Sequence, residues 1–137
     1  MKNNPLLIVL GEPNSIFSEI LFKSYKKKII QKLNRPVLII GSINLLKSQM
    51  KSLKFSIKIK DLGSFYKKKL KLNKKFMYVI NVNYKFKKNF EKISSNSNYY
   101  INNCFKIAAK LLKNKSAFAL INGPISKTHF LKKKFLG

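Results

Sequence analysis

An apolar run at residues 6–10 ends abruptly in a Gly-Glu-Pro turn, and this feature most constrains the fold. The run, Leu-Leu-Ile-Val-Leu, has no polar alternation, which predicts a strand covered on both faces, as in parallel α/β sheets. Gly11 and Pro13 end the strand, and Asn14 or Ser15 is placed to cap the next helix. The turn therefore belongs at the carboxyl edge of a sheet, where such folds bind ligands, although an ordinary turn has the same pattern.

The same pattern of apolar run, glycine and capped helix recurs along the chain, for example at Gly41 with Ser42 and at Gly123 with Ser126. Such repetition predicts βαβ units and a three-layer α/β/α fold with a mostly parallel sheet. We expect strands at residues 6–10, 37–40, 55–59, 76–80 and 117–121, the third of them near a sheet edge. We expect helices at residues 15–33, 42–53, 99–112 and 126–137.

The first of these helices has an apolar stripe, and its proposed end is a proline. The stripe recurs every four residues, and we expect it to be buried; its members are Phe17, Leu21, Tyr25, Ile29 and Leu33, widened by Ile16 and Ile20. Pro36 disfavours helix at the preceding residue and is expected to stop the helix. Residues 61–75 are expected to form an irregular loop, and residues 81–98 a surface connection.

Composition indicates one folded domain and a strongly basic surface. The 137 residues are 45% hydrophobic and carry a formal net charge of +26. This charge raises the possibility of a nucleic-acid partner, but only Arg35 is an arginine and the lysines occur in every segment, which favours solvated lysine faces. A small nucleic-acid-binding protein stays an alternative, with aromatic–lysine clusters at residues 65–67 and 84–87 as its best candidates.

The single cysteine and single histidine limit the chemistry of the chain. Cys104 excludes an internal disulfide, and its place on the apolar stripe of residues 99–112 predicts a packed, inert thiol. His129 with four acidic residues makes a poor basis for a transition-metal site. Because no run approaches about 20 apolar residues and no signal peptide is evident, we expect a cytoplasmic protein that does not enter the membrane.

Three segments resemble one enzyme family in order and spacing. Gly11-Glu12-Pro13 with Glu19-Ile20 resembles the Gly-(Asp/Glu)-Pro-Ala-Gly-Ile-Gly-Pro-Glu opening of 4-hydroxythreonine-4-phosphate dehydrogenases, which act in pyridoxal phosphate biosynthesis. Arg35-Pro36-Val37 with Gly41 is similar to their second strand. Asn122-Gly123-Pro124-Ile125-Ser126-Lys127 is similar to their Val-Thr-(Ala/Gly)-Pro-Ile-x-Lys segment. The match departs from the family at Ser15, Phe17 and Ser18, which replace Gly, Gly and Pro.

The resemblance implies the isocitrate/isopropylmalate dehydrogenase-like fold, with residues 1–137 as the N-terminal part of a two-domain enzyme. It implies a homodimer that uses NAD and a divalent metal ion to oxidise and decarboxylate a small phosphorylated amino-acid substrate. The family's catalytic and metal-binding histidines would follow Gly137, so no catalytic or metal-binding residue is expected within this segment, and the segment alone is expected to be inactive. A non-catalytic paralogue or assembly module is a further alternative.

Four residues at the predicted carboxyl edge are candidates for lining the ligand cleft. Glu12 and Asn14 belong to the first turn, and Asn122 and Lys127 to the last. In a parallel sheet these turns meet at one edge, so we expect the four side chains to face a common cleft. Lys127 would offer a cation to a phosphate or carboxylate, although a solvated or structural lysine fits the sequence equally well.

Overall fold

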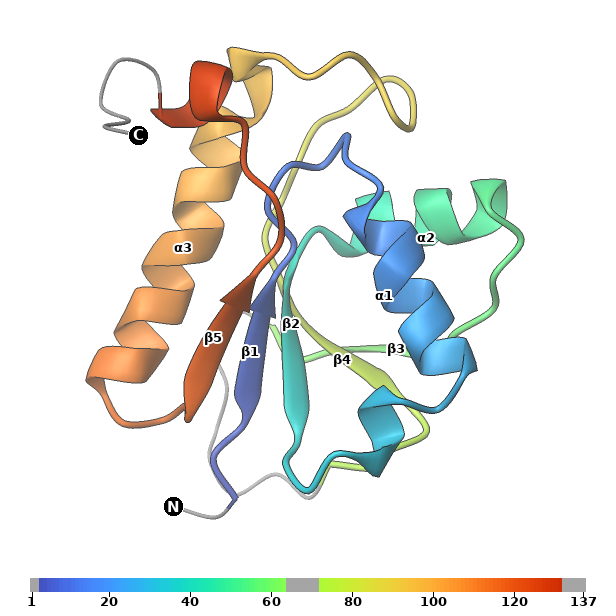
Figure 1. Cartoon of the computed structure of the whole chain (residues 1–137), viewed down its shortest axis with the longest axis vertical. Coiled ribbons are helices and arrows are strands. Elements are labelled where there is room, and N and C mark those ends of the chain that lie inside the picture. Colours follow the sequence, from blue (N-terminus) through green and yellow to red (C-terminus); the bar gives the residue numbers. More distant parts are fainter. Residues whose placement is uncertain (1–2, 64–71, 132–137) are drawn as a thin grey trace.

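The computed structural model describes residues 3–63 and 72–131 and contains a five-stranded sheet with helices on both faces (Figure 1). Its elements are β1 (Leu6–Val9), α1 (Phe17–Lys26), η1 (Ile30–Lys32), β2 (Val37–Gly41), α2 (Ile43–Ser52), β3 (Ile59–Asp61), β4 (Met77–Asn81), η2 (Ser95–Ser97), α3 (Asn98–Lys113), β5 (Ala119–Asn122) and η3 (Lys127–Leu131). The strand order is β3-β4-β2-β1-β5, and all neighbouring strands are parallel. The predicted α/β class is confirmed.

Each face of the sheet has its own hydrophobic core because side chains alternate along a strand. In β1, Leu7 and Val9 pack in the core under α3, whereas Ile8 packs in the core under α1 and α2. Figure 1 shows α3 on one side of the sheet and the other two helices on the opposite side. The residues of β1 and β2 are apolar without alternation because both faces are covered, as the sequence predicted for three layers.

The first helix is shorter than the predicted 15–33, and a lysine is the reason. Lys28 adopts a left-handed conformation with φ of 58°. The amide of Ile29 then donates to the carbonyl of Ser24 at 2.9 Å, which completes a Schellman turn and ends α1. Glycine usually occupies the left-handed position of this turn, so a lysine there conceals the end of the helix in the sequence.

The predicted apolar stripe of the first helix is wrong over part of its length. Phe22 is fully buried and Leu21 nearly so. By contrast, the structure exposes Ile16, Ile20, Ile29 and Leu33, at 69%, 50%, 52% and 38%. Two of these lie beyond the end of α1, so a stripe that continues one helix through residue 33 places them incorrectly.

The second and third helices agree closely with the prediction. The Ser42 hydroxyl accepts a hydrogen bond from the amide of Leu45 at 3.2 Å, which confirms the predicted cap of α2. The stripe of α3 packs on the sheet, and Cys104 on it is fully buried. No helix within the described part of the chain is long and apolar enough to cross a membrane.

Two predicted elements differ from those observed. β3 lies at the sheet edge as predicted, but it starts at Ile59, because pairing with β4 begins only where the amide of Met77 donates to the carbonyl of Lys58. The predicted helix at 126–137 is described only as the short η3, whose amide at His129 donates to the Ser126 hydroxyl. Gly137 and residues 64–71 of the predicted loop lie outside the described residues.

Candidate functional site at the carboxyl edge of the sheet

The turns after β1 and β5 lie side by side at the carboxyl edge of the sheet. The two strands are parallel neighbours, and Val9 is in register with Asn122 at their ends (Figure 1). The amide of Gly123 donates to the carbonyl of Val9 at 2.7 Å, and that of Glu12 donates to the carbonyl of Pro124 at 2.8 Å. The structure therefore brings together the two turns that carry all four candidate residues.

Two glycines permit this close approach. A Cβ atom on Gly11 would clash with the backbone carbonyl of Pro124, and one on Gly123 would clash with that of Leu10. Gly11 also has φ of +71°, which L side chains rarely adopt. Both family-like motifs contain the glycine that the packing of the turns requires.

Glu12 is buried within the turn, and its carboxylate binds protein groups. Its side chain is 3% exposed. One carboxylate oxygen accepts from the amide of Asn14 at 3.1 Å, and the other accepts from the hydroxyl of Ser97 at 3.0 Å. A buried carboxylate is stable when hydrogen bonds replace its hydration, as these two do. Glu12 therefore joins the first turn to the start of α3.

The backbone amides of the first turn are largely occupied by internal partners. The amides of Glu12 and Asn14 have the partners given above, and the amide of Ser15 donates to the Glu12 carbonyl at 3.2 Å. The amide of Phe17, the first residue of α1, donates to the Ser15 hydroxyl at 3.3 Å. The N-cap of α1 is nevertheless Ile16, which makes no side-chain capping hydrogen bond, so the predicted cap by Asn14 or Ser15 is wrong. These amides do not form the open phosphate cradle typical of glycine-rich nucleotide loops.

Asn14 secures the connection that crosses this edge of the sheet. Its side-chain oxygen accepts from the amide of Glu91 at 3.1 Å, 77 residues away in the sequence. The same connection is held by Asn89, whose side chain donates to the carbonyl of Ser48. Residues 81–98 were expected to be a surface connection, and within them Asn89 and Glu91 attach the chain to α2 and to the turn after β1.

Asn122 and Lys127 are exposed at this edge. The side chain of Asn122 donates to the carbonyl of Gly123 at 3.0 Å, which holds the amide against its own turn. Lys127 is the first residue of η3, and η3 is attached to α3 because the Asn98 side chain donates to the carbonyl of His129. Of the four candidates, these two are exposed residues, whereas Glu12 is buried and Asn14 is partly buried.

Several residues that build this edge were missed by reasoning from the sequence. The start of α2 is bound by two of them: the Asn81 side chain accepts from the amide of Ile43 at 3.0 Å, and the Tyr100 hydroxyl accepts from the amide of Ser42 at 2.9 Å. The third, Ser97, binds Glu12 in the turn after β1. Asn81 directly follows the apolar run of β4, so its position at a strand end was a usable signal. Ser97 and Tyr100 reach the edge only through tertiary packing.

Burial suppresses ionisation of the aromatic and thiol groups beneath this edge. Desolvation raises the pKa of Tyr100 well above its usual value, and burial raises the pKa of Cys104 to about 12. Burial, then the charges of Glu12 and Glu91, raise the pKa of Tyr84, which packs on Tyr100 with ring centroids 4.7 Å apart. The Cys104 thiol is therefore protonated near neutral pH and belongs to the core.

The donor set at this edge does not fit a metal ion. Among the described residues, no three His, Cys, Asp or Glu side chains come together in a group that could bind one. Glu12 is bound by Ser97 and Asn14, and His129 contributes its backbone carbonyl to Asn98. A metal ion at this edge would need ligands from outside the described residues.

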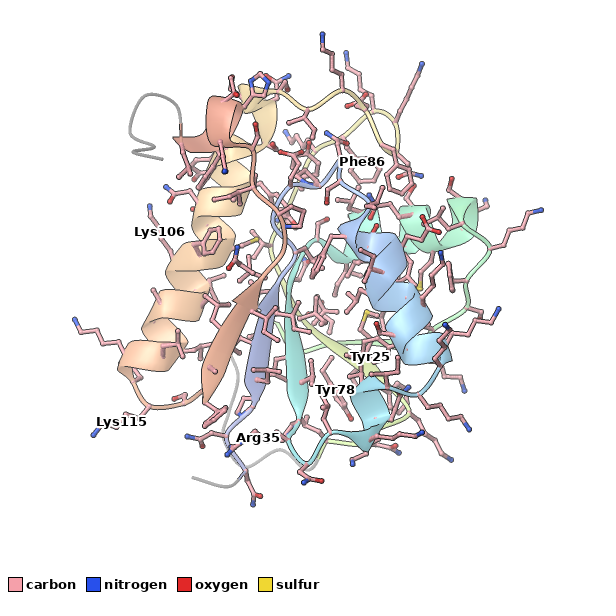
Figure 2. All side chains as sticks on the ribbon, viewed as in Figure 1. Tyr25, Arg35, Tyr78, Phe86, Lys106 and Lys115 are labelled. Atoms are coloured by element: carbon pink, nitrogen blue, oxygen red, sulfur yellow. The ribbon has the colours of Figure 1, made fainter. Side chains whose placement is uncertain are left out.

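The aromatic–lysine cluster at residues 84–87 packs against the protein. Tyr84 contacts Tyr100, and its ring stacks on that of Phe86 at 6.1 Å between centroids. Figure 2 shows Phe86 in the connection above the carboxyl edge. Stacking platforms for nucleic-acid bases need open aromatic faces, and Tyr84 uses its ring within the fold. The other cluster, at residues 65–67, lies outside the described residues.

Solved structures of known enzymes share this fold. A 4-hydroxythreonine-4-phosphate dehydrogenase from Burkholderia phymatum matches 96% of this chain and 39% of its own, with a TM-score of 0.79 and 15% identity. The same enzyme from Klebsiella pneumoniae matches 95% of this chain and 40% of its own, with a TM-score of 0.80 and 15% identity. No protein-family profile and no curated protein sequence matches the chain. The chain thus has the fold of these dehydrogenases over about two fifths of their length.

Proposed function

We propose that this chain is the N-terminal part of an NAD-dependent 4-hydroxythreonine-4-phosphate dehydrogenase. The observation that carries the proposal is the fold match over 96% of the chain, combined with the family-like turns at Gly11 and Gly123 that meet at one edge of the sheet. The reaction would oxidise the substrate hydroxyl with NAD and release carbon dioxide, as the resemblance implies. We place the complete enzyme in the cytoplasm as a homodimer.

In this proposal the chain supplies one wall of the substrate cleft. Asn122 and Lys127 lie exposed at the carboxyl edge, where an amide and an ammonium group offer hydrogen bonds to the phosphate or carboxylate of the substrate. Glu12 and Asn14 act indirectly, since they fix the turn after β1 to α3 and to the connection at Glu91. Rigid positioning of this kind lowers the entropic cost of aligning a substrate.

The described residues do not hold NAD or a metal ion in this proposal. The amides of the first turn are bound to protein oxygens, and no described group of side chains fits a metal. Both would bind to residues of the complete enzyme that follow Gly137. The division of labour therefore places substrate contacts on this chain and the redox and metal chemistry on a second domain.

The gene sequence and an activity assay test the proposal together. We expect the reading frame to continue past codon 137 and to encode Gly-His-Thr soon afterwards. The complete protein, supplied with NAD, a divalent metal and 4-hydroxythreonine 4-phosphate, should form NADH, whereas residues 1–137 should form none above a no-protein control. A stop codon directly after Gly137, or turnover by residues 1–137, would refute the proposed division of labour.

A further inference from the structure

A basic hollow lies at the opposite, amino edge of the sheet. It has a volume of about 560 Å³ and is lined by the end of α1, by η1, by the segment between α2 and β3, and by the residue two positions before β4. Lys58 and Lys75 each come just before a strand, which places the hollow at the edge away from Asn122 and Lys127. The cleft proposed above therefore does not include it.

The floor of the hollow is apolar and partly aromatic. It is formed by Tyr25, Phe55 and Ile57. Tyr25 is 5% exposed and lies on the sheet side of α1 (Figure 2). Phe55 packs on Phe22 with ring centroids 5.6 Å apart. These rings are held by the core, so a ligand would meet a preformed apolar surface.

The turn that ends α2 sets the position of the floor. Lys54 has φ of 58°, and the amide of Phe55 donates back to the carbonyl of Met50 at 2.9 Å. This Schellman turn reverses the chain directly after the helix and brings the ring of Phe55 to the hollow. The backbone of this wall is therefore fixed by hydrogen bonds in the absence of any ligand.

Among the residues that the structure describes, four lysines and no acidic residue line the hollow. Lys26, Lys54, Lys58 and Lys75 come from three different segments, and Lys26 lies 5.8 Å from the centre of the Phe55 ring. The chain has only four acidic residues, of which Glu19 pairs with Lys23 and Glu12 with Ser97. Four like charges around one hollow repel one another, and a bound anion would remove that repulsion.

Gln31 adds an unsatisfied hydrogen-bond acceptor. It lines the hollow, and its side-chain nitrogen donates to the Tyr25 carbonyl at 3.1 Å. Its side-chain oxygen is buried and accepts no hydrogen bond from any described residue. Buried acceptors are nearly always satisfied, so this oxygen is an uncompensated polar group beside the hollow.

We propose that this hollow binds a small organic phosphate with an aromatic or other apolar body. The lysine rim would bind the phosphate, and the Tyr25–Phe55 floor would bind the body. The volume lies within the range of about 300–1,000 Å³ that is typical of small-molecule sites. A nucleic acid would instead need a continuous basic track with several open aromatic faces, and of the two floor rings only that of Phe55 is partly exposed, since Tyr25 is buried.

Three probes distinguish binding to the lysine rim from binding to the apolar floor in the complete protein. Calorimetric titration with phenyl phosphate, inorganic phosphate and phenol should give the tightest binding for phenyl phosphate, by about tenfold over either half, because it alone engages both surfaces. Equal binding of phenyl phosphate and inorganic phosphate would show adsorption by charge alone and overturn the proposal. Displacement of phenyl phosphate by a short single-stranded oligonucleotide at physiological salt would overturn it in favour of nucleic acid.

Charge-matched variants locate the site. The double variant K54Q/K58Q should weaken phenyl phosphate about tenfold, whereas K106Q/K113Q, with the same net charge but on the exposed face of α3, should leave it unchanged (Figure 2). Phe55→Leu should remove the preference for phenyl phosphate over inorganic phosphate and keep the affinity for inorganic phosphate. Equal losses of affinity for phenyl phosphate in the two double variants would refute a specific site. Circular dichroism checks that each variant is folded.

Discussion

The two edges of the sheet are built differently. At the carboxyl edge, segments far apart in the sequence are joined by specific contacts, such as the Glu12 carboxylate with the Ser97 hydroxyl, 85 residues away. At the amino edge, three helices end in local turns in which a lysine is left-handed, at Lys28, Lys54 and Lys115. These contacts at the carboxyl edge therefore depend on the identity of single residues, and these three helix ends at the amino edge depend on backbone conformation.

The largest expected effect comes from breaking the close approach at the carboxyl edge. Gly11→Ala should lower the free energy of unfolding by about 3 kcal/mol or more, because its Cβ would clash with the Pro124 carbonyl. Gly63→Ala is the control, since Gly63 has nearly the same φ, +73°, but nothing within 4 Å. It should cost about 1 kcal/mol from conformation alone. Equal losses in the free energy of unfolding of the two variants, measured by urea denaturation, would contradict the clash.

A smaller effect should follow from removing the long-range contact of Glu12. Glu12→Gln replaces one buried acceptor oxygen with a donor and should cost about 2 kcal/mol. Ser97→Ala should cost less, and the double variant should show a coupling energy of about 1 kcal/mol between the two side chains. Urea unfolding of the four proteins measures this coupling. Additive losses would mean that the hydrogen bond contributes nothing to the carboxyl edge.

Alkaline pH tests the buried groups that support the carboxyl edge. Burial raises the pKa of Cys104 from 9.0 to about 12, so the unfolded chain loses its thiol proton first. This contribution to stability is complete below pH 9.0 and is lost as the pH rises toward 12. At about pH 10 the loss should be about 1.4 kcal/mol. Cys104→Ala should reduce the slope of stability against pH above 9; an unchanged slope would contradict the assignment to Cys104.

The smallest effect is a gain in stability at the amino edge. Lys115 has φ of 54° in the turn that ends α3, and Lys115→Gly should raise the free energy of unfolding by about 0.5–1 kcal/mol, because glycine adopts this conformation without strain. Lys113→Gly, inside the last turn of α3, should instead lower it by a similar amount. Thermal unfolding compares the two variants. A lower free energy of unfolding in both variants would show that the left-handed conformation of Lys115 carries no strain.

The sequence predicted the central strands well because they are buried on both faces. Runs such as residues 37–40 need apolar side chains throughout, and that signal is local. The cap at Ser42 and the packed thiol at Cys104 were equally readable, because a cap and a helical stripe depend on nearby residues. The end of α1 was not readable, because Lys28 occupies a position where glycine normally marks the stop.

The candidate site was only partly predictable for a different reason. The turn positions of Asn122 and Lys127 followed from strand ends, and the structure places both turns at one edge. Whether these side chains line a cleft stays a prediction. The burial of Glu12 was not predictable, because its carboxylate depends on the hydroxyl of Ser97. The position of Ser97 is set in turn by a connection whose sequence has no helical or strand periodicity. Contacts of this kind arise from tertiary packing, which a local pattern does not encode.

The most direct test is the KM for 4-hydroxythreonine 4-phosphate in the complete protein, measured for variants at the two edges. Lys127→Gln and Asn122→Ala at the carboxyl edge should each raise KM by about tenfold, as expected for a lost contact to a charged substrate. Lys115→Gln at the amino edge removes one exposed lysine and should leave KM unchanged (Figure 2). An unchanged KM in both carboxyl-edge variants, or an increase only in Lys115→Gln, would contradict a substrate cleft at the carboxyl edge.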